Sequence, residues 1–222
     1  MKTGRLTREN KAKEVAGYLN RYYPHTESFL HYKKDWELLF AVILSAQATD
    51  KSVNEATALL FAKFPELEDY TRENLPGILT CIKHVGLGKS KGNYLIKSAS
   101  VLLTKYNGTV PKDRNELRKL PGVGFKTSGV VLAELYDYPF IPVDTHIYRV
   151  AHRLGLVPES YTPEKTELAL EELFQNQHAI DRHHSLILFG REICKSQKPS
   201  CNCCPFASFC RFYRSRKKIK DK

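Results

Sequence analysis

Long apolar runs are missing from this sequence. No stretch of roughly 18 consecutive apolar residues occurs, so no membrane-spanning helix is expected. The first ten residues are polar and lack the apolar segment of a secretory signal peptide. The sequence also lacks the alternation of apolar and polar residues that is typical of strands, and it has no low-complexity segment. These absences favour a helical protein of the cytosol or the nucleoid.

Acidic residues are in short supply. The 222-residue chain carries 24 Asp and Glu against 35 Lys and Arg, a net charge of +11. This surplus favours a polyanionic partner such as nucleic acid, although solubility and a few basic tails would also account for it. The basic tail, residues 211–222, is expected to be frayed and available for phosphate. An apolar content of 42% suffices for one large domain or two small ones.

Helical periodicity runs through most of the chain, and we expect an all-α protein with short loops. In the first helix, apolar side chains up to Tyr22 share one face. Asp35 and Asp144 are expected N-caps, and Asp113 with Glu116 has the pattern of a capping box. The expected helices span residues 11–23, 36–46, 53–64, 92–105, 113–120, 126–136, 145–154, 162–175 and 183–194.

Cysteines are few, but five of the six crowd into 17 residues near the end of the chain. In a reducing compartment such a cluster indicates a metal site rather than disulfides. Zinc ribbons usually present two C-x2-C pairs, and this chain has one, so the spacing favours a [4Fe–4S] cluster without excluding structural zinc. Cys203 can replace Cys204 as a ligand, and Cys81 is expected to be a buried apolar residue. The candidate ligands are Cys194, Cys201, Cys204 and Cys210.

The segment Leu120–Gly124, sequence LPGVG, joins two expected helices. Its glycines allow a tight turn and a close approach of another chain, and the free amides at the start of the next helix suit a phosphate. An ordinary turn between two helices has the same pattern. Lys126 follows in the first turn, where the helix dipole disfavours a cation, so its amine should lose its proton more easily and act as a nucleophile. A solvated surface lysine is the alternative.

Two further polar residues stand out. Asp144, as an N-cap, should stay ionised and could stabilise a cationic sugar-like transition state, although most such residues only cap their helix. Gln47 interrupts an apolar helix and is suited to fill the gap that an extruded base leaves in a duplex. A polar residue at the end of a helix is the simpler interpretation.

These segments occur together and in order, and the chain resembles the endonuclease III family of bacterial DNA glycosylases with AP lyase activity. The resemblance spans about residues 36–210 and includes LSAQATD, GLGKSKGN, LPGVGFKTSGVVL and VDTHIYRVAHRLGL, together with the cysteine loop. It implies two α-helical domains with a DNA-binding cleft between them. Residues 28–138 would form a helical barrel ending in a helix–hairpin–helix motif. Residues 1–27 and 139–222 would form an iron–sulfur domain.

The resemblance also implies roles for particular residues. Lys126 matches the catalytic nucleophile and Asp144 the assisting carboxylate, while the four candidate cysteines match the ligands of a [4Fe–4S] cluster. The implied partner is double-stranded DNA with oxidised pyrimidines or abasic sites, bound by a monomer without any membrane contact. The implied DNA-binding residues are Ser45, Gln47, Leu87, Leu120, Gly122, Val123, Gly124 and His146.

Two departures from the family pattern and two alternative functions remain. Phe125 occupies a hairpin position that is often basic, and Gly88–Lys89 differs from the commonest versions beside Leu87. A monofunctional glycosylase would use water as the nucleophile and would usually lack a lysine at position 126. A DNA-binding or redox-sensing module without enzymatic activity would not need that lysine.

Overall fold

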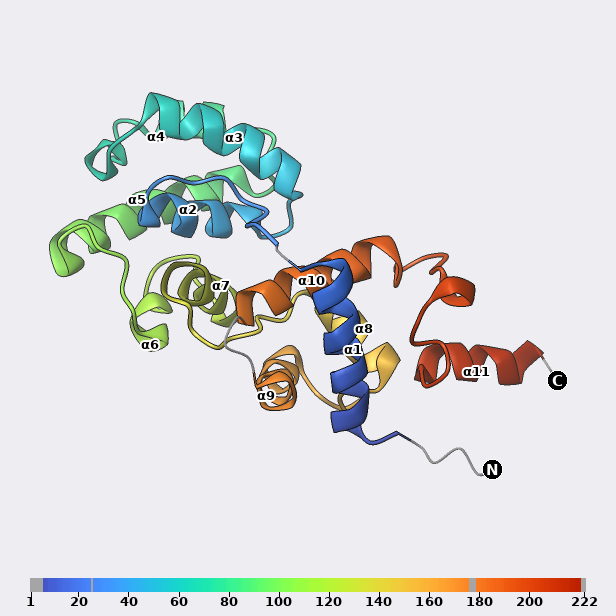
Figure 1. Cartoon of the computed structure of the whole chain (residues 1–222). Coiled ribbons are helices and arrows are strands. Elements are labelled where there is room, and N and C mark those ends of the chain that lie inside the picture. Colours follow the sequence, from blue (N-terminus) through green and yellow to red (C-terminus); the bar gives the residue numbers. More distant parts are fainter. Residues whose placement is uncertain (1–5, 25, 176–178, 221–222) are drawn as a thin grey trace. The chain divides into compact units, whose positions relative to one another are not determined.

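The structure, a computed structural model, describes residues 6–24, 26–175 and 179–220, with side chains up to residue 216. Every regular element in these ranges is a helix, and the ranges contain no strand (Figure 1). The expected all-α class is therefore confirmed. None of the described helices is long and apolar enough to cross a membrane.

The chain divides into two compact units. One consists of residues 28–136, and the other combines residues 1–27 with residues 137–222. The first of these units ends at Tyr136, and the domain expected from the sequence ended at Tyr138. We refer to them as the central unit and the terminal unit.

A fully buried helix organises the central unit. Helix α2 (Asp35–Ser45) is buried from Trp36 to Leu44, and α3, α5 and α7 pack around it. A helix enclosed on every side is expected to be largely apolar, and every residue from Trp36 to Leu44 except Glu37 is apolar. The other helices are α3 (Asp50–Lys63), η1 (Leu67–Asp69), α4 (Leu75–Cys81), α5 (Gly88–Tyr106), α6 (Arg114–Leu117) and α7 (Phe125–Tyr136).

The start of α2 differs from the expectation. Asp35 is the first helical residue and not the N-cap, which is Lys34. The buried carboxylate of Glu37 accepts hydrogen bonds from the backbone amides of Lys33 at 2.6 Å and Lys34 at 3.2 Å. A Glu at the third helical position reaches back to these amides, so no capping side chain is needed at Asp35.

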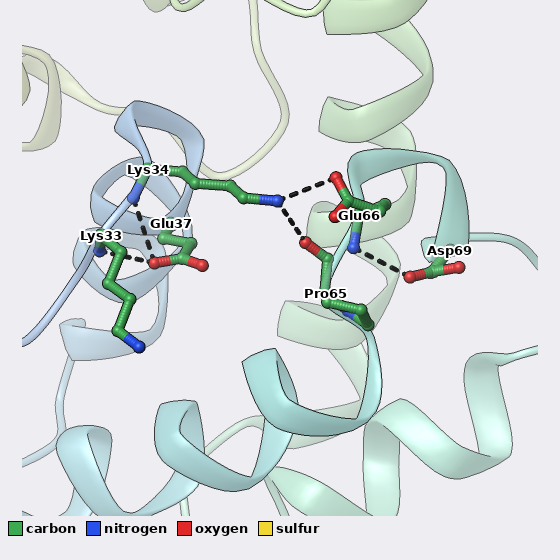
Figure 2. A network of polar contacts seen from close by, with 6 residues as sticks. All are labelled: Lys33, Lys34, Glu37, Pro65, Glu66 and Asp69. Carbon is green, nitrogen blue, oxygen red and sulfur yellow. Dashed lines mark hydrogen bonds and ion pairs between the residues drawn. The ribbon is translucent and has the colours of Figure 1, made fainter.

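Lys34 also ties this helix end to the turn before η1. Figure 2 shows its ammonium group donating to the Pro65 carbonyl at 2.7 Å and pairing with Glu66 at 2.8 Å. The Glu66 amide in turn donates to the Asp69 carboxylate at 2.9 Å. This network fixes the α2 N-terminus against the loop that follows α3.

The terminal unit is built around α10 (Ala179–Glu192), which packs against α8 and α1. Rings from three segments meet at its core: Phe206 lies 5.3 Å from both Tyr18 and Phe189 between ring centroids. These contacts connect the N-terminal helix with the cysteine loop. The remaining helices are α1 (Arg8–Tyr22), α8 (Thr145–Leu154), α9 (Pro163–Phe174), η2 (Cys201–Cys203) and α11 (Arg211–Lys220).

Several expected helix features need correction. Tyr22 is 57% exposed, and the buried face of α1 begins instead at Lys11 and Ala12. Helix α6 ends at Leu117 rather than Leu120, and α10 begins at Ala179 rather than at residue 183. Helix α4 was not expected at all. The tail, expected to fray, forms α11 as far as Lys220, and residues 221–222 lie outside the described ranges.

Candidate functional site

The hairpin between α6 and α7 is held by α5. Gly122 has φ of 81°, and a Cβ there would lie 2.7 Å from Cδ2 of Tyr94. The Ser98 hydroxyl donates to the Pro121 carbonyl at 3.2 Å. Only glycine adopts this conformation without strain and leaves room for the ring. The LPGVG segment is therefore a tight turn that packs against α5 and requires glycine at position 122.

The apolar and glycine residues of this hairpin have different surroundings. Leu120 and Val123 are buried, with 2% and 7% of their surface exposed. Gly122 and Gly124 are exposed, and a Cβ at Gly124 would meet nothing within 4 Å. Any ligand contact here would be made by the backbone, while Leu120 and Val123 anchor the turn from inside.

Lys126 is the second residue of α7 and is half-buried. The first turn of α7 contains no acidic residue. The positive end of the helix dipole is thus uncompensated by a carboxylate in this turn. This is the electrostatic setting from which the sequence predicts a readily deprotonated amine.

Phe125 beside it is covered by guanidinium groups. The Arg114 group lies 4.3 Å and the Arg118 group 5.8 Å from the ring centroid. Hydrogen bonds from Lys105 first, and then from other donors, lower the pKa of Glu116 to about 2. The acidic side chain in the first turn of α6 is therefore paired with Lys105 and Lys119, and two arginines lie over the aromatic ring at residue 125.

Asp144 is the N-cap of α8, as expected. Its Oδ1 accepts a hydrogen bond from the Ile147 amide at 2.7 Å. Within the described ranges its Oδ2 accepts no hydrogen bond, and the side chain is half-buried. One carboxylate oxygen is therefore fixed, and the other can serve a ligand.

His146 and Arg149 connect this cap to the cysteine loop. An Arg149 nitrogen lies 3.2 Å from Nδ1 of His146 and also donates to the Gly190 carbonyl at 2.8 Å. Its Nε donates to the Cys194 carbonyl at 2.9 Å. Burial lowers the pKa of Arg149, and these carbonyls compensate for the lost water. The imidazole of His146 is thus held in place from its own helix.

Gln47 and Leu87 occupy two exposed turns of the central unit and share an unusual backbone. Both residues are left-handed, with φ of 56° for Gln47 and 61° for Leu87, and Leu87 is 60% exposed. Non-glycine residues in this region are uncommon and often functional. Ser45 lies at the end of α2, where its hydroxyl donates to the Val42 carbonyl at 2.8 Å.

The cysteine loop encloses a small cavity, which four of its five cysteines line: Cys194, Cys201, Cys204 and Cys210. Cys203 is exposed, is not among the lining residues, and its thiol donates to the Ser200 carbonyl at 3.4 Å. Burial raises the pKa of the Cys204 thiol to about 11. In the described ranges no three metal-binding side chains converge on one ion site, so the arrangement is a ring of thiols around a cavity.

Arg153 of α8 braces this loop. Its guanidinium donates to the Cys194 sulfur at 3.6 Å and to the Lys195 carbonyl at 2.7 Å, and it stacks 4.1 Å from the Phe212 ring centroid. Together with Arg149 it brings cationic side chains of α8 to the cavity wall. Neither arginine was singled out from the sequence, because its partners, the Cys194 and Lys195 carbonyls and the Gly190 carbonyl, lie more than forty residues away in the chain.

The structure thus defines a protein of two helical units, one with a helix–hairpin–helix motif and the other with a loop of clustered cysteines. Residues 40–176 match the HhH-GPD superfamily base excision DNA repair protein family, to which this chain belongs. Family membership makes it a DNA glycosylase of base excision repair.

Its relatives include well-covered endonuclease III sequences. The endonuclease III of Rickettsia conorii is 45% identical over 190 residues, 86% of this chain and 90% of the relative. That of Escherichia coli strain K12 is 42% identical over 205 residues, 91% and 97% of the two chains. A solved non-covalent endonuclease III–DNA complex is 37% identical with a TM-score of 0.89, covering 96% of this chain and 99% of its own. A trapped endonuclease III–DNA covalent intermediate has a TM-score of 0.88.

Proposed function

We propose that this chain removes oxidised pyrimidines from duplex DNA and then nicks the strand 3′ to the abasic site through a Schiff base on Lys126. The position of Lys126 carries the proposal. It lies in the first turn of α7, two residues after the open Gly124 and without a carboxylate in that turn. At such a position the helix dipole opposes a cation, which favours a lysine that acts as a nucleophile.

The chemistry follows from a neutral amine meeting the sugar of an extruded nucleotide. Nζ of Lys126 attacks C1′, the bond from C1′ to the base breaks, and the base leaves with its electron pair. Ring opening gives a Schiff base between Nζ and C1′. Loss of a proton from C2′ then expels the 3′ phosphate, and water releases the lysine from the shortened strand.

Asp144 supplies charge and a proton acceptor to the same nucleotide. Its Oδ1 is held by the Ile147 amide, while Oδ2 accepts no hydrogen bond from the described residues. An ionised carboxylate stabilises the positive charge that develops at C1′ as the base leaves, and it shuttles protons during elimination. The resemblance also implies a DNA contact for His146, whose Nδ1 lies 3.2 Å from an Arg149 nitrogen.

DNA would be held by the backbone of the hairpin and by side chains that enter the base stack. The exposed amides around Gly122 and Gly124 suit one phosphate, which positions the duplex without reading its sequence. Gln47 and Leu87 enter the stack where the damaged nucleotide leaves, and Ser45 lies close to the first of these turns. We expect a monomer acting on nucleoid DNA.

The cysteine loop fits a [4Fe–4S] cluster. Four thiols line one largely apolar cavity, and the fifth cysteine, Cys203, stands outside it. A bound cluster would cross-link the loop from Cys194 to Cys210. The thiols must lose their protons to bind iron, and the guanidinium of Arg153 donates a hydrogen bond to the Cys194 sulfur. We assign the cluster a structural role in positioning this basic loop.

Replacement of Lys126 tests the proposal. Lys126→Ala should abolish nicking of a duplex with one abasic site while binding of the same duplex persists. Nicking that survives in the purified variant contradicts the assignment. Base release without nicking by the wild type would indicate a monofunctional glycosylase, and binding without either activity would indicate a DNA-binding module.

A further inference from the structure

The left-handed turns at Gln47 and Leu87 need an external support. A non-glycine residue in this conformation costs on the order of 1–3 kcal/mol and persists only where its surroundings impose it. Both residues are exposed, so their own side chains cannot provide that support by packing. The turns are neighbours, since a Cβ on Gly86 would lie 3.6 Å from the Gln47 carbonyl oxygen.

The Lys91 side chain bonds to the Gln47 turn from inside. Its side chain is buried, with 2% of the residue exposed, and Nζ donates to the carbonyls of Leu44 at 2.9 Å and Ala46 at 2.6 Å. Its backbone amide donates to the Leu87 carbonyl at 3.0 Å. The side chain therefore holds the chain immediately before Gln47, whereas the bond to Leu87 is the ordinary first backbone hydrogen bond of α5.

The lysine is suited to this position by charge. Helix α2 has no basic residue in its last turn, so its final carbonyls lack a cation of their own. Lys91 supplies one from α5, where it adds to the positive end of its own helix. Burial lowers the pKa of Lys91, which shows the cost of placing an ammonium group here. An apolar residue would fill the space at lower cost but would donate no hydrogen bond.

We propose that Lys91 is a positioning residue that holds the Gln47 turn, next to the Leu87 turn, in the geometry that extrudes a nucleotide. This inference rests on the proposed function, because it assigns Lys91 to the extrusion step that precedes attack by Lys126. It predicts that losing the two side-chain hydrogen bonds weakens extrusion more than it weakens the fold.

Lys91→Met is the direct test, because methionine keeps an unbranched apolar stem and removes the donors. The probe is a duplex with one abasic site flanked by 2-aminopurine, whose fluorescence rises when the stack opens. We expect the variant to lose most of the fluorescence change seen with wild type. Its single-turnover nicking should fall about tenfold, as for loss of a charged hydrogen bond. Leu102→Ala, on the same helix and fully buried, is the control and should keep the fluorescence change.

A kinetic cycle with Gln47 separates positioning from general destabilisation. If Lys91 acts through this turn, the double variant Lys91→Met/Gln47→Ala should nick about as fast as Gln47→Ala alone. Losses that multiply in the double variant overturn the inference. Should Lys91→Met fail to fold, Lys91→Gln retains a shorter donor, and the same cycle and the same criterion apply to it.

The two levels of the proposal fail differently. A wild-type protein that neither opens the stack nor nicks the duplex contradicts the proposed function itself. A wild type that does both, with an equal fluorescence change in Lys91→Met, contradicts only the role of Lys91.

Discussion

Replacing Gly122 by alanine should destabilise the hairpin through two separable effects. The left-handed backbone costs an alanine roughly 1–2 kcal/mol. The added Cβ would lie 2.7 Å from Cδ2 and 3.0 Å from Cγ of Tyr94, so the ring must move. Overpacking of this kind costs typically about 1–3 kcal/mol. The sum, roughly 2–5 kcal/mol, corresponds to a Tm lower by about 4–20 °C for a chain of this size.

Two other glycines separate these effects. Gly108 is also left-handed, with φ of 75°, but a Cβ there meets nothing within 4 Å. Gly108→Ala should therefore show only the backbone cost, a decrease of about 2–8 °C. Gly124 lies outside the left-handed region and is equally open, so Gly124→Ala should leave Tm unchanged or raise it slightly.

Thermal unfolding followed by circular dichroism measures all three variants. Adding Tyr94→Ala to Gly122→Ala should recover the steric part of the loss and leave the backbone part. If Gly122→Ala is no less stable than Gly108→Ala, the contact with Tyr94 does not shape this turn, and the docking of the hairpin on α5 is wrong.

Three further predictions concern charge and cysteines. Asp144→Asn should keep the helix cap, so its free energy of unfolding should lie within about 0.5 kcal/mol of that of the wild type. Its nicking rate should fall by at least about 10²-fold because the negative charge is lost. An unchanged nicking rate would show that Asp144 only caps its helix. Cys203→Ser should keep the iron content and brown colour of the purified protein, and Cys204→Ser should lose both. The reverse pattern would show that Cys203, and not Cys204, is the cluster ligand. Because its partners, Lys105 first, lower the pKa of Glu116 to about 2, its stabilising effect is present above the unfolded pKa of about 4.3 and is lost as the pH falls through about 2. Glu116→Gln should accordingly lower Tm at pH 6 and leave it unchanged near pH 2, whereas an equal decrease at both would refute the charge argument.

Helices that have a capping residue at the start and a terminating residue at the end could be predicted from the sequence. Helix α8 begins and ends where expected, because Asp144 caps its start and Gly155, with φ of 70°, ends it. Helix α4 was not predicted, and its second and third residues, Pro76 and Gly77, are types that disfavour the interior of a helix. In the fold Pro76 lies at the helix start, and Gly77 leaves room for the ring of Phe64, which a Cβ would approach to 2.9 Å.

The site could be predicted in part. The hairpin, Lys126 and the Asp144 cap follow from short local patterns, and the resemblance supplied their roles. Spacing left the choice between Cys203 and Cys204 open and the resemblance matched Cys204, which is partly buried while Cys203 is exposed. Lys91 was overlooked although it shares with Lys126 an unfavourable place in a first helical turn, because the carbonyls that compensate it lie more than forty residues away.

Trapping with borohydride tests the central claim most directly. Wild-type protein incubated with a duplex containing one abasic site, in the presence of borohydride, should form a covalent protein–DNA adduct. Mass spectrometry of the digested adduct should place the DNA remnant on Lys126, and Lys126→Ala should form none. No adduct with wild type, or an adduct mapped to another residue, would contradict the account.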